Sequence, residues 1–257
     1  MEKKKVIVVG GGIIGLATAY YLDLEGHDVS IIDKGKLDSG TSHINSGYLT
    51  PSHIVPMAAP GVVSKGIRWM FNSSSPFYIK PRFDLDLISW GLKFMKSCTP
   101  EHVKKSMKPI LDANLLSKKL YLEMQESKVF DFDLESKGLL MVYKTSNAEK
   151  EEAKVAFMAK DLGVKVNQLS QEEILKMQPN APMEVEGGFM YESDAHCTPE
   201  LFMNNLKKYL MAQGVNFILN TEVSSFKKNG KKIQALRTDK GIFKGDEYVL
   251  ASGAWSE

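Results

Sequence analysis

The feature that most constrains this chain is a glycine-rich turn near its N-terminus, placed between an apolar strand and a helix. The strand is Val6–Val9, a run of β-branched residues, and the sequence Gly10-x-Gly12-x-x-Gly15 follows it directly. Beyond the glycines, apolar residues recur at helical spacing as far as Leu24. The pattern predicts a strand, a tight turn and a helix that ends at Gly26.

Each glycine of this turn has its own physical task. Gly10 makes the turn, Gly12 lets the backbone approach a pyrophosphate, and Gly15 lets the helix lie close to the strand. The free N–H groups at the helix N-terminus favour phosphates there. A second strand, Val29–Ile32, ends at Asp33, where an acidic residue is expected to bind ribose hydroxyls. Replacing Asp33 by alanine is expected to leave no buried hydrogen-bonding group without its partner. This order of elements predicts a bound dinucleotide.

After Asp33 the chain departs from a nicotinamide-binding Rossmann domain. Residues 34–49 are rich in glycine and hydroxyl side chains, where another plain helix and strand would be expected. Backbone N–H groups and short polar side chains in such a loop suit a long cofactor.

Composition and charge argue against several other classes of protein. The 257 residues carry a net charge of +2, with lysines scattered among acids, which argues against a nucleic-acid surface. Cys98 and Cys197 are far apart, so we predict neither a disulfide framework nor a metal site, and His196 beside Cys197 is interpreted as structural. No apolar run reaches the about 18 residues of a membrane span. Glycines interrupt the apolar start of the chain, so we expect a mature cytoplasmic N-terminus rather than a signal peptide.

The glycine turn, taken together with Gly40-Thr41-Ser42 and Gly47, resembles the FAD-dependent D-amino-acid oxidase superfamily, which includes glycine oxidase, sarcosine oxidase and D-amino-acid dehydrogenase. Within it, residues 50–62, 75–82 and 87–94 are most similar to bacterial D-amino-acid dehydrogenases. The resemblance implies an α/β fold, with a Rossmann-like FAD-binding domain (a parallel sheet plus a β-meander) and an inserted α+β substrate domain. We expect the FAD-binding domain at 1–84 and 196–257, and the substrate domain at 85–195.

The resemblance also implies FAD as the cofactor. Some relatives attach flavin through a histidine in the loop after the second strand, but His43 lies one position away, so non-covalent FAD is expected. In relatives, the residue that matches Val223 bonds adenine through its backbone, and the turn from Ser252 to Trp255 packs near the cofactor. The residues expected to contact FAD are Gly10, Gly11, Gly12, Ile13, Ile14, Gly15, Asp33, Lys34, Thr41, Ser42, Asn45, Ser46, Gly47, Tyr48, Leu49, Val223, Ser252, Gly253 and Trp255.

Several elements of the remaining chain can be predicted locally. Helices are expected at 84–98, 101–108 and 110–128, with a break at Pro109. Capping boxes of Ser146 with Glu149 and of Ser170 with Glu173 open helices near 147–162 and 171–177.

The activity that the resemblance implies is oxidation of the amine of a D-amino acid, or a related small amino acid, to an imino acid, with hydride passing to flavin N5. That step needs no side-chain acid or base, so no catalytic side chain is assigned. Two alternatives stay open: a glycine, sarcosine or hydroxyproline type of oxidase that uses oxygen, and a flavin-binding module without catalysis.

Aromatic and basic residues of 65–95 suit a peripheral membrane anchor that would pass electrons to a quinone; alternatively they cover the substrate domain.

An α-carboxylate is matched best by the fork of an arginine. In relatives this arginine lies beyond the turn at Ser252–Trp255, and Arg68, Arg82 and Arg237 do not match its position. We therefore expect the 257 residues to be a C-terminally incomplete fragment that forms much of the FAD site with little or no turnover.

Overall fold

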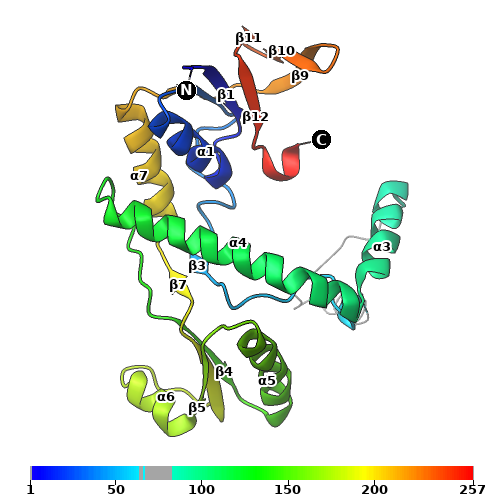
Figure 1. Cartoon of the computed structure of the whole chain (residues 1–257), viewed down its shortest axis with the longest axis vertical. Helices are drawn as coiled ribbons and strands as arrows, with labels where there is room; N and C mark the ends of the chain where they lie inside the picture. The colour runs from blue at the N-terminus through cyan, green and yellow to red at the C-terminus, as the bar shows by residue number, and fades with distance from the viewer. Residues whose placement is uncertain (1, 64–65, 67–82, 257) are drawn as a thin grey trace. The chain divides into compact units, whose positions relative to one another are not determined.

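The computed structural model describes residues 2–63, 66 and 83–256 (Figure 1). It divides into two compact units, each built from separate stretches of chain. The first unit comprises Met1–Tyr48, Tyr121–Glu135 and His196–Glu257, and the second comprises Leu49–Leu120 and Ser136–Ala195. The short strands β3 (Tyr48–Leu49) and β7 (Ala195–His196) lie where the chain passes between the units. The predicted domain boundaries at 84/85 and 195/196 stay predictions.

A parallel sheet forms the centre of the first unit. Its strands follow the order β12 (Glu247–Leu250), β1 (Lys5–Val9), β2 (Asp28–Ile32) and β8 (Asn216–Ile218). β1 is parallel to both of its neighbours, and β2 is parallel to β8. All four apolar residues of β1 are buried, as expected for a strand that is covered on both faces.

Helices and a β-meander cover the two faces of this sheet. Helix α1 (Ile13–Leu24) lies on the face of Val8, and α7 (Pro199–Ala212) packs beside α1, with the rings of Tyr20 and Tyr209 5.7 Å apart. On the other face, Ile7 and Val9 share a core with Leu236 of the meander. The meander consists of β9 (Val223–Asn229), β10 (Lys232–Thr238) and β11 (Gly241–Phe243). The prediction of a parallel sheet with a β-meander is thus confirmed.

The second unit is built around an antiparallel sheet in the order β4 (Leu139–Tyr143), β6 (Gly187–Tyr191) and β5 (Val166–Ser170). Helix α5 (Ser146–Asp161) buries Ala156 and Ala159 against it. Two further helices of this unit are α3 (Leu85–Ser97) and the short α6 (Gln171–Met177), which the predicted capping box of Ser170 and Glu173 opens. The mixed α+β character expected of this part of the chain is confirmed.

Two local predictions are wrong. Helix α4 (Pro100–Glu126) runs through Pro109 without the predicted break. Proline removes one intrahelical hydrogen bond, and here Met107 and Leu111 on either side of it both pack into the core of the second unit, which holds the two halves of the helix together. The N-cap of α5 is Thr145, whose hydroxyl accepts the N–H of Ala148, so the predicted box of Ser146 with Glu149 starts one residue too late.

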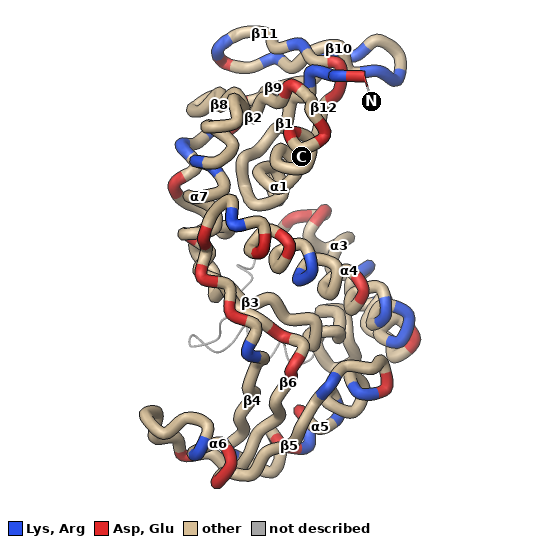
Figure 2. Tube along the Cα trace, turned by 60° about the vertical axis from the view of Figure 1, so that its left-hand side comes forward, with Lys and Arg blue, Asp and Glu red and all other residues tan. Residues whose placement is uncertain are grey.

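Acidic and basic residues are interspersed along α4 and α5 (Figure 2). On α4, two pairs lie one helical turn apart: Glu101 with Lys105 at 2.8 Å, and Lys108 with Asp112. This mixed pattern is that of solvated helix faces. No helix of the described residues combines the length and apolar character that would let it cross a bilayer.

Candidate functional site

The turn between β1 and α1 is shaped by two glycines that the protein's own packing requires. Gly10 has φ of +102°, and a Cβ there would lie 2.5 Å from the carbonyl oxygen of Ala251. A Cβ on Gly15 would lie 1.8 Å from the carbonyl oxygen of Gly10. No side chain fits in either place, so these two glycines allow α1 and β12 to approach the turn.

Gly12 differs from both of these glycines. Its φ of −66° and ψ of −175° are open to any residue, and among the described residues a Cβ there would meet within 4 Å only the hydroxyl oxygen of Ser42, at 3.3 Å. The packing of the described residues therefore does not require a glycine at this position. The open space at the backbone of Gly12 is the space that a closely approaching ligand would use.

The space beside Gly12 lies at the N-terminus of α1. An α-helix leaves its first four N–H groups without intrahelical partners. Gly12, as N-cap, has no side chain to accept one, and Ser42 accepts the N–H of Ile13 at 3.1 Å. The side chain of the next residue, Ile14, is 66% exposed. The end of the helix is thus suited to an anion.

Asp33 connects this turn to the loop that follows β2. One carboxylate oxygen accepts the N–H of Gly11 and the other accepts the N–H of Gly35, both at 2.7 Å. The expectation that replacing Asp33 would strand no partner is wrong, because both backbone donors depend on it. A carboxylate offers about four lone-pair sites, so Asp33 can still accept hydroxyl groups from a ligand.

We expect Asp33→Ala to weaken FAD binding by about 1.5–3 kcal/mol, the range for hydrogen bonds to charged groups. It should also lower the free energy of unfolding, since the N–H groups of Gly11 and Gly35 lose their acceptor. Titration of FAD followed by flavin fluorescence measures the first effect and thermal unfolding the second. Asp33→Asn, which keeps one acceptor oxygen, should lie between the wild type and Asp33→Ala. Unchanged FAD affinity in Asp33→Ala would assign the ribose contact to another acid, with Asp38 the first candidate.

The last turn of the chain lies against the same site. The N–H of Ala251 donates to the carbonyl of Val9 at 2.8 Å, and the hydroxyl of Ser252 donates to the same oxygen at 3.3 Å. The short helix η1 (Gly253–Trp255) follows, and the ammonium group of Lys34 lies 3.7 Å from the centre of the Trp255 ring. The structure therefore brings the glycine turn, Asp33, Lys34 and the last turn together from distant parts of the sequence.

The loop after β2 is held largely by its own contacts. The amide of Asn45 donates to the carbonyls of Thr41 and Ser42 at 3.0 and 3.2 Å, and its oxygen accepts the N–H of Gly47 at 2.8 Å. Asn45 is thus committed to the loop itself. Ser42 is the one member of this loop whose side chain bonds to the helix end within the described residues.

The other predicted residues of this region make their described contacts elsewhere than at the turn. Gly47, with φ of +68°, packs against the backbone of Cys197, where a Cβ would lie 2.0 Å from the carbonyl oxygen. Ser46 and Tyr48 are exposed, and Leu49 already belongs to the second unit. Val223 begins β9 in register with Thr238, half-buried against the core of sheet and meander.

Two residues near the turn are not predicted from the sequence. Leu37 has φ of +57°, is buried, and its side chain fills the place where Gly11 would carry a Cβ. The N–H of Gly35 is the second donor to Asp33. The glycine-rich character of the loop could have pointed to Gly35, but no local pattern identifies Leu37.

Cys197 does not have the environment of a reactive thiol. Burial raises the pKa of this thiol to about 11, which disfavours the nucleophilic thiolate near neutral pH. Its neighbour His196 lies 3.9 Å from Glu135. Across the described residues, His, Cys, Asp and Glu side chains form no group of three or more suited to a metal ion.

Comparison with known proteins agrees with this geometry. The family described as FAD dependent oxidoreductase matches residues 5–257. A protein named D-amino acid dehydrogenase from Neisseria meningitidis is 30% identical over 257 residues, covering 98% of this chain and 61% of its own length. One of the same name from Granulibacter bethesdensis is 28% identical, again over 61% of its length.

Solved structures show the same fold. Glycine oxidase from Geobacillus kaustophilus superposes with a TM-score of 0.66 and 23% identity, over 99% of this chain and 56% of its own. An L-amino acid deaminase from Proteus vulgaris gives a TM-score of 0.67 at 17% identity, over 98% of this chain and 54% of its own. Resemblance at this level of identity concerns the fold alone.

Proposed function

Because this chain belongs to the family of FAD-dependent oxidoreductases, we propose that it holds FAD at the turn between β1 and α1 and takes part in oxidising the amine of a D-amino acid, or a related small amino acid, to an imino acid. The observation that carries the proposal is the open space beside Gly12 at the N-terminal end of α1. The relatives named D-amino acid dehydrogenase support the substrate class. The chain spans about three fifths of the length of these relatives, so its substrate and activity are part of the proposal.

Each part of the turn has one task in this proposal. The N–H groups at the start of α1 bind the pyrophosphate, because their partial positive charge attracts anions and Gly12 leaves room for them. Asp33 accepts hydroxyl groups of the ribose with the lone pairs that Gly11 and Gly35 leave unused. Lys34 adds a positive charge, placed by the ring of Trp255.

When bound, FAD supplies flavin N5 as the hydride acceptor. The protein's contribution is to bind and orient the reactants, and no side chain of the chain is assigned as acid or base. Of the chain's arginines, Arg237 lies in β10 in register with Ser225, and Arg68 and Arg82 lie outside the described residues. An arginine from outside these 257 residues as the partner of the substrate carboxylate stays a prediction.

The test is anaerobic flavin reduction in the FAD-loaded protein, followed by its visible absorbance over a panel of D- and L-amino acids at high concentration. We expect slow bleaching that is specific for D-enantiomers. Equal or faster bleaching by L-enantiomers would contradict the assigned substrate. Retention of oxidised flavin with every amino acid, glycine and sarcosine included, would favour a flavin-binding module without catalysis.

The electron acceptor is tested by mixing the reduced protein with oxygen or with a soluble quinone. A dehydrogenase should reoxidise slowly with oxygen and quickly with the quinone, whereas rapid reaction with oxygen would favour the glycine or sarcosine type of oxidase. A membrane anchor at 67–95 stays a prediction, since most of its aromatic and basic residues lie outside the described residues. Trp90, which is described, is 51% exposed and stacks on Phe94.

A further inference from the structure

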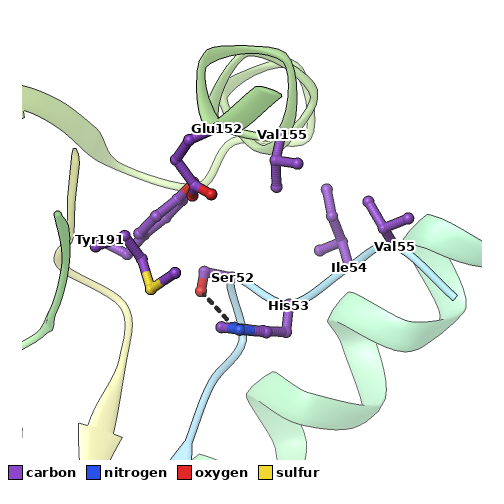
Figure 3. A pocket seen from close by; sticks show the side chains of 8 residues that line it. Ser52, His53, Ile54, Val55, Glu152, Val155 and Tyr191 are labelled. Atoms are coloured by element: carbon purple, nitrogen blue, oxygen red, sulfur yellow. Dashed lines mark hydrogen bonds between the residues drawn. The ribbon is translucent and has the colours of Figure 1, made fainter. Parts of the chain in front are cut away.

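The second unit contains a small pocket that has no role in the proposed oxidation (Figure 3). Its volume is about 200 Å³, and every residue that lines it belongs to this unit. Pockets for drug-sized ligands measure roughly 300–1,000 Å³. The pocket therefore suits a molecule of only a few heavy atoms.

One part of the pocket wall is apolar. Ile54, Val55 and Val155 lie together on one side in Figure 3, and Met141 also contributes to the lining. Ile54 belongs to the buried core of the unit, and Val55 and Met141 pack against that core. The apolar wall is thus part of a fixed core and would favour a short aliphatic chain.

The opposite part of the wall carries a carboxylate held by a phenol. The hydroxyl of Tyr191 donates to Glu152 at 2.6 Å. Burial, reinforced by this hydrogen bond, raises the pKa of Tyr191 far above its ordinary value, so the phenol keeps its proton and remains the donor. Glu152, on α5, points its carboxylate toward the pocket in Figure 3 and offers its remaining lone pairs to an occupant.

The imidazole of His53 lies across the pocket from Glu152, and a hydrogen bond between Ser52 and its Nδ1 orients it (Figure 3). The buried hydroxyl of Ser52 donates to the carboxylate of Asp194 at 2.5 Å. Ser52 can therefore offer only a lone pair to Nδ1 of His53, 3.2 Å away, and this arrangement favours the tautomer with its proton on Nδ1. In the neutral ring Nε2 is then an acceptor.

We propose that this pocket binds a small aliphatic amine in its protonated form, one that carries no carboxylate. Glu152 supplies the negative charge, and His53 supplies a second acceptor. The apolar wall takes the aliphatic chain. No lysine or arginine is among the described residues that line the pocket, so a carboxylate in the same molecule would find no partner among them. The ligand class therefore differs from the amino acids of the proposed oxidation, and the inference does not depend on that function.

The experiment measures binding of four matched probes to the FAD-loaded protein by calorimetry. Isoamylamine, isoamyl alcohol, isovalerate and leucine share an aliphatic chain and differ in charge. We expect isoamylamine to bind at least about tenfold more tightly than the other three, the factor expected of a charge-assisted hydrogen bond.

Two variants locate the binding. Glu152→Gln removes the charge but keeps an oxygen that accepts the hydroxyl of Tyr191, and it should weaken isoamylamine about tenfold. Val155→Phe keeps the charge and fills the pocket, and it should abolish binding. Glu200→Gln removes an exposed carboxylate on α7 and serves as the matched control, with wild-type affinity expected.

The possible outcomes decide the proposal. Weaker isoamylamine binding in Glu152→Gln and lost binding in Val155→Phe, with wild-type affinity in Glu200→Gln, support it, provided that the variants unfold at the same temperature as the wild type. Isoamylamine that binds equally well to Glu152→Gln and Val155→Phe overturns it, as does the lack of any preference over leucine or isovalerate. No detectable binding of isoamylamine to the wild type overturns it as well.

Discussion

Replacement of Gly12 by valine is expected to abolish FAD binding and to leave the fold intact. The φ and ψ angles of Gly12 suit valine, and in the part of the chain that the structure describes no other backbone atom lies within 4 Å of an added Cβ. The valine side chain would instead occupy the space at the N-terminal end of α1 that the pyrophosphate needs. Calorimetric titration with FAD should give no measurable heat of binding, while circular dichroism and thermal unfolding match the wild type.

The control for this variant is Gly91→Val, which adds the same atoms to α3, where no atom of the described residues lies within 4 Å of the new Cβ. It should bind FAD as the wild type does. If Gly12→Val purified with a full complement of FAD, the ligand would have to lie elsewhere.

Replacement of Gly15 by valine is expected to have the opposite pattern, with the fold itself failing. A Cβ at this position would lie 1.8 Å from the carbonyl oxygen of Gly10, a backbone atom in a tight turn that cannot move without displacing β1 or α1. Overpacking of this kind costs about 1–3 kcal/mol, and we expect at least the upper end because both groups are held by the sheet and the helix. Thermal unfolding of Gly15→Val beside Gly91→Val measures the effect, and equal midpoints would show that the close contact is not required.

The comparison of these two glycines shows how far the sequence could predict the site. The motif correctly placed a turn at Gly10–Gly12, since strand and helix periodicities on either side are local properties. It gave Gly12 and Gly15 different tasks, and the surroundings of the two residues do differ in that way. Strands, helices and turns set by neighbouring residues, such as the box of Ser170 with Glu173, were predictable for the same reason.

Contacts between distant residues were not predictable. Asp33 accepts the N–H of Gly11, which is 22 residues away, and this bond depends on the spacing of β1 and β2 in the folded sheet. The continuity of α4 at Pro109 depends likewise on the core that Met107 and Leu111 share. Leu37, with its left-handed backbone, has no local signature at all. In each case tertiary packing outweighs local preference.

The pocket of the second unit illustrates the same limit. Its lining comes from the segment 52–55, from β4, from α5 and from the end of β6. Glu152 and Tyr191 are 39 residues apart, and neither stands in a recognisable motif. Only the packing of α5 on the sheet brings the carboxylate and the phenol together.

Hydrogen–deuterium exchange of the protein with and without FAD tests the central claim most directly, because it reports where the cofactor lies as well as whether it binds. We expect FAD to slow exchange in peptides that cover 10–15, 33–49 and 252–255, and to leave those from β4, β5 and β6 unchanged. The same experiment on Gly12→Val should show no protection in any of them. Protection by FAD confined to 139–191, with none at the glycine turn, would contradict the account.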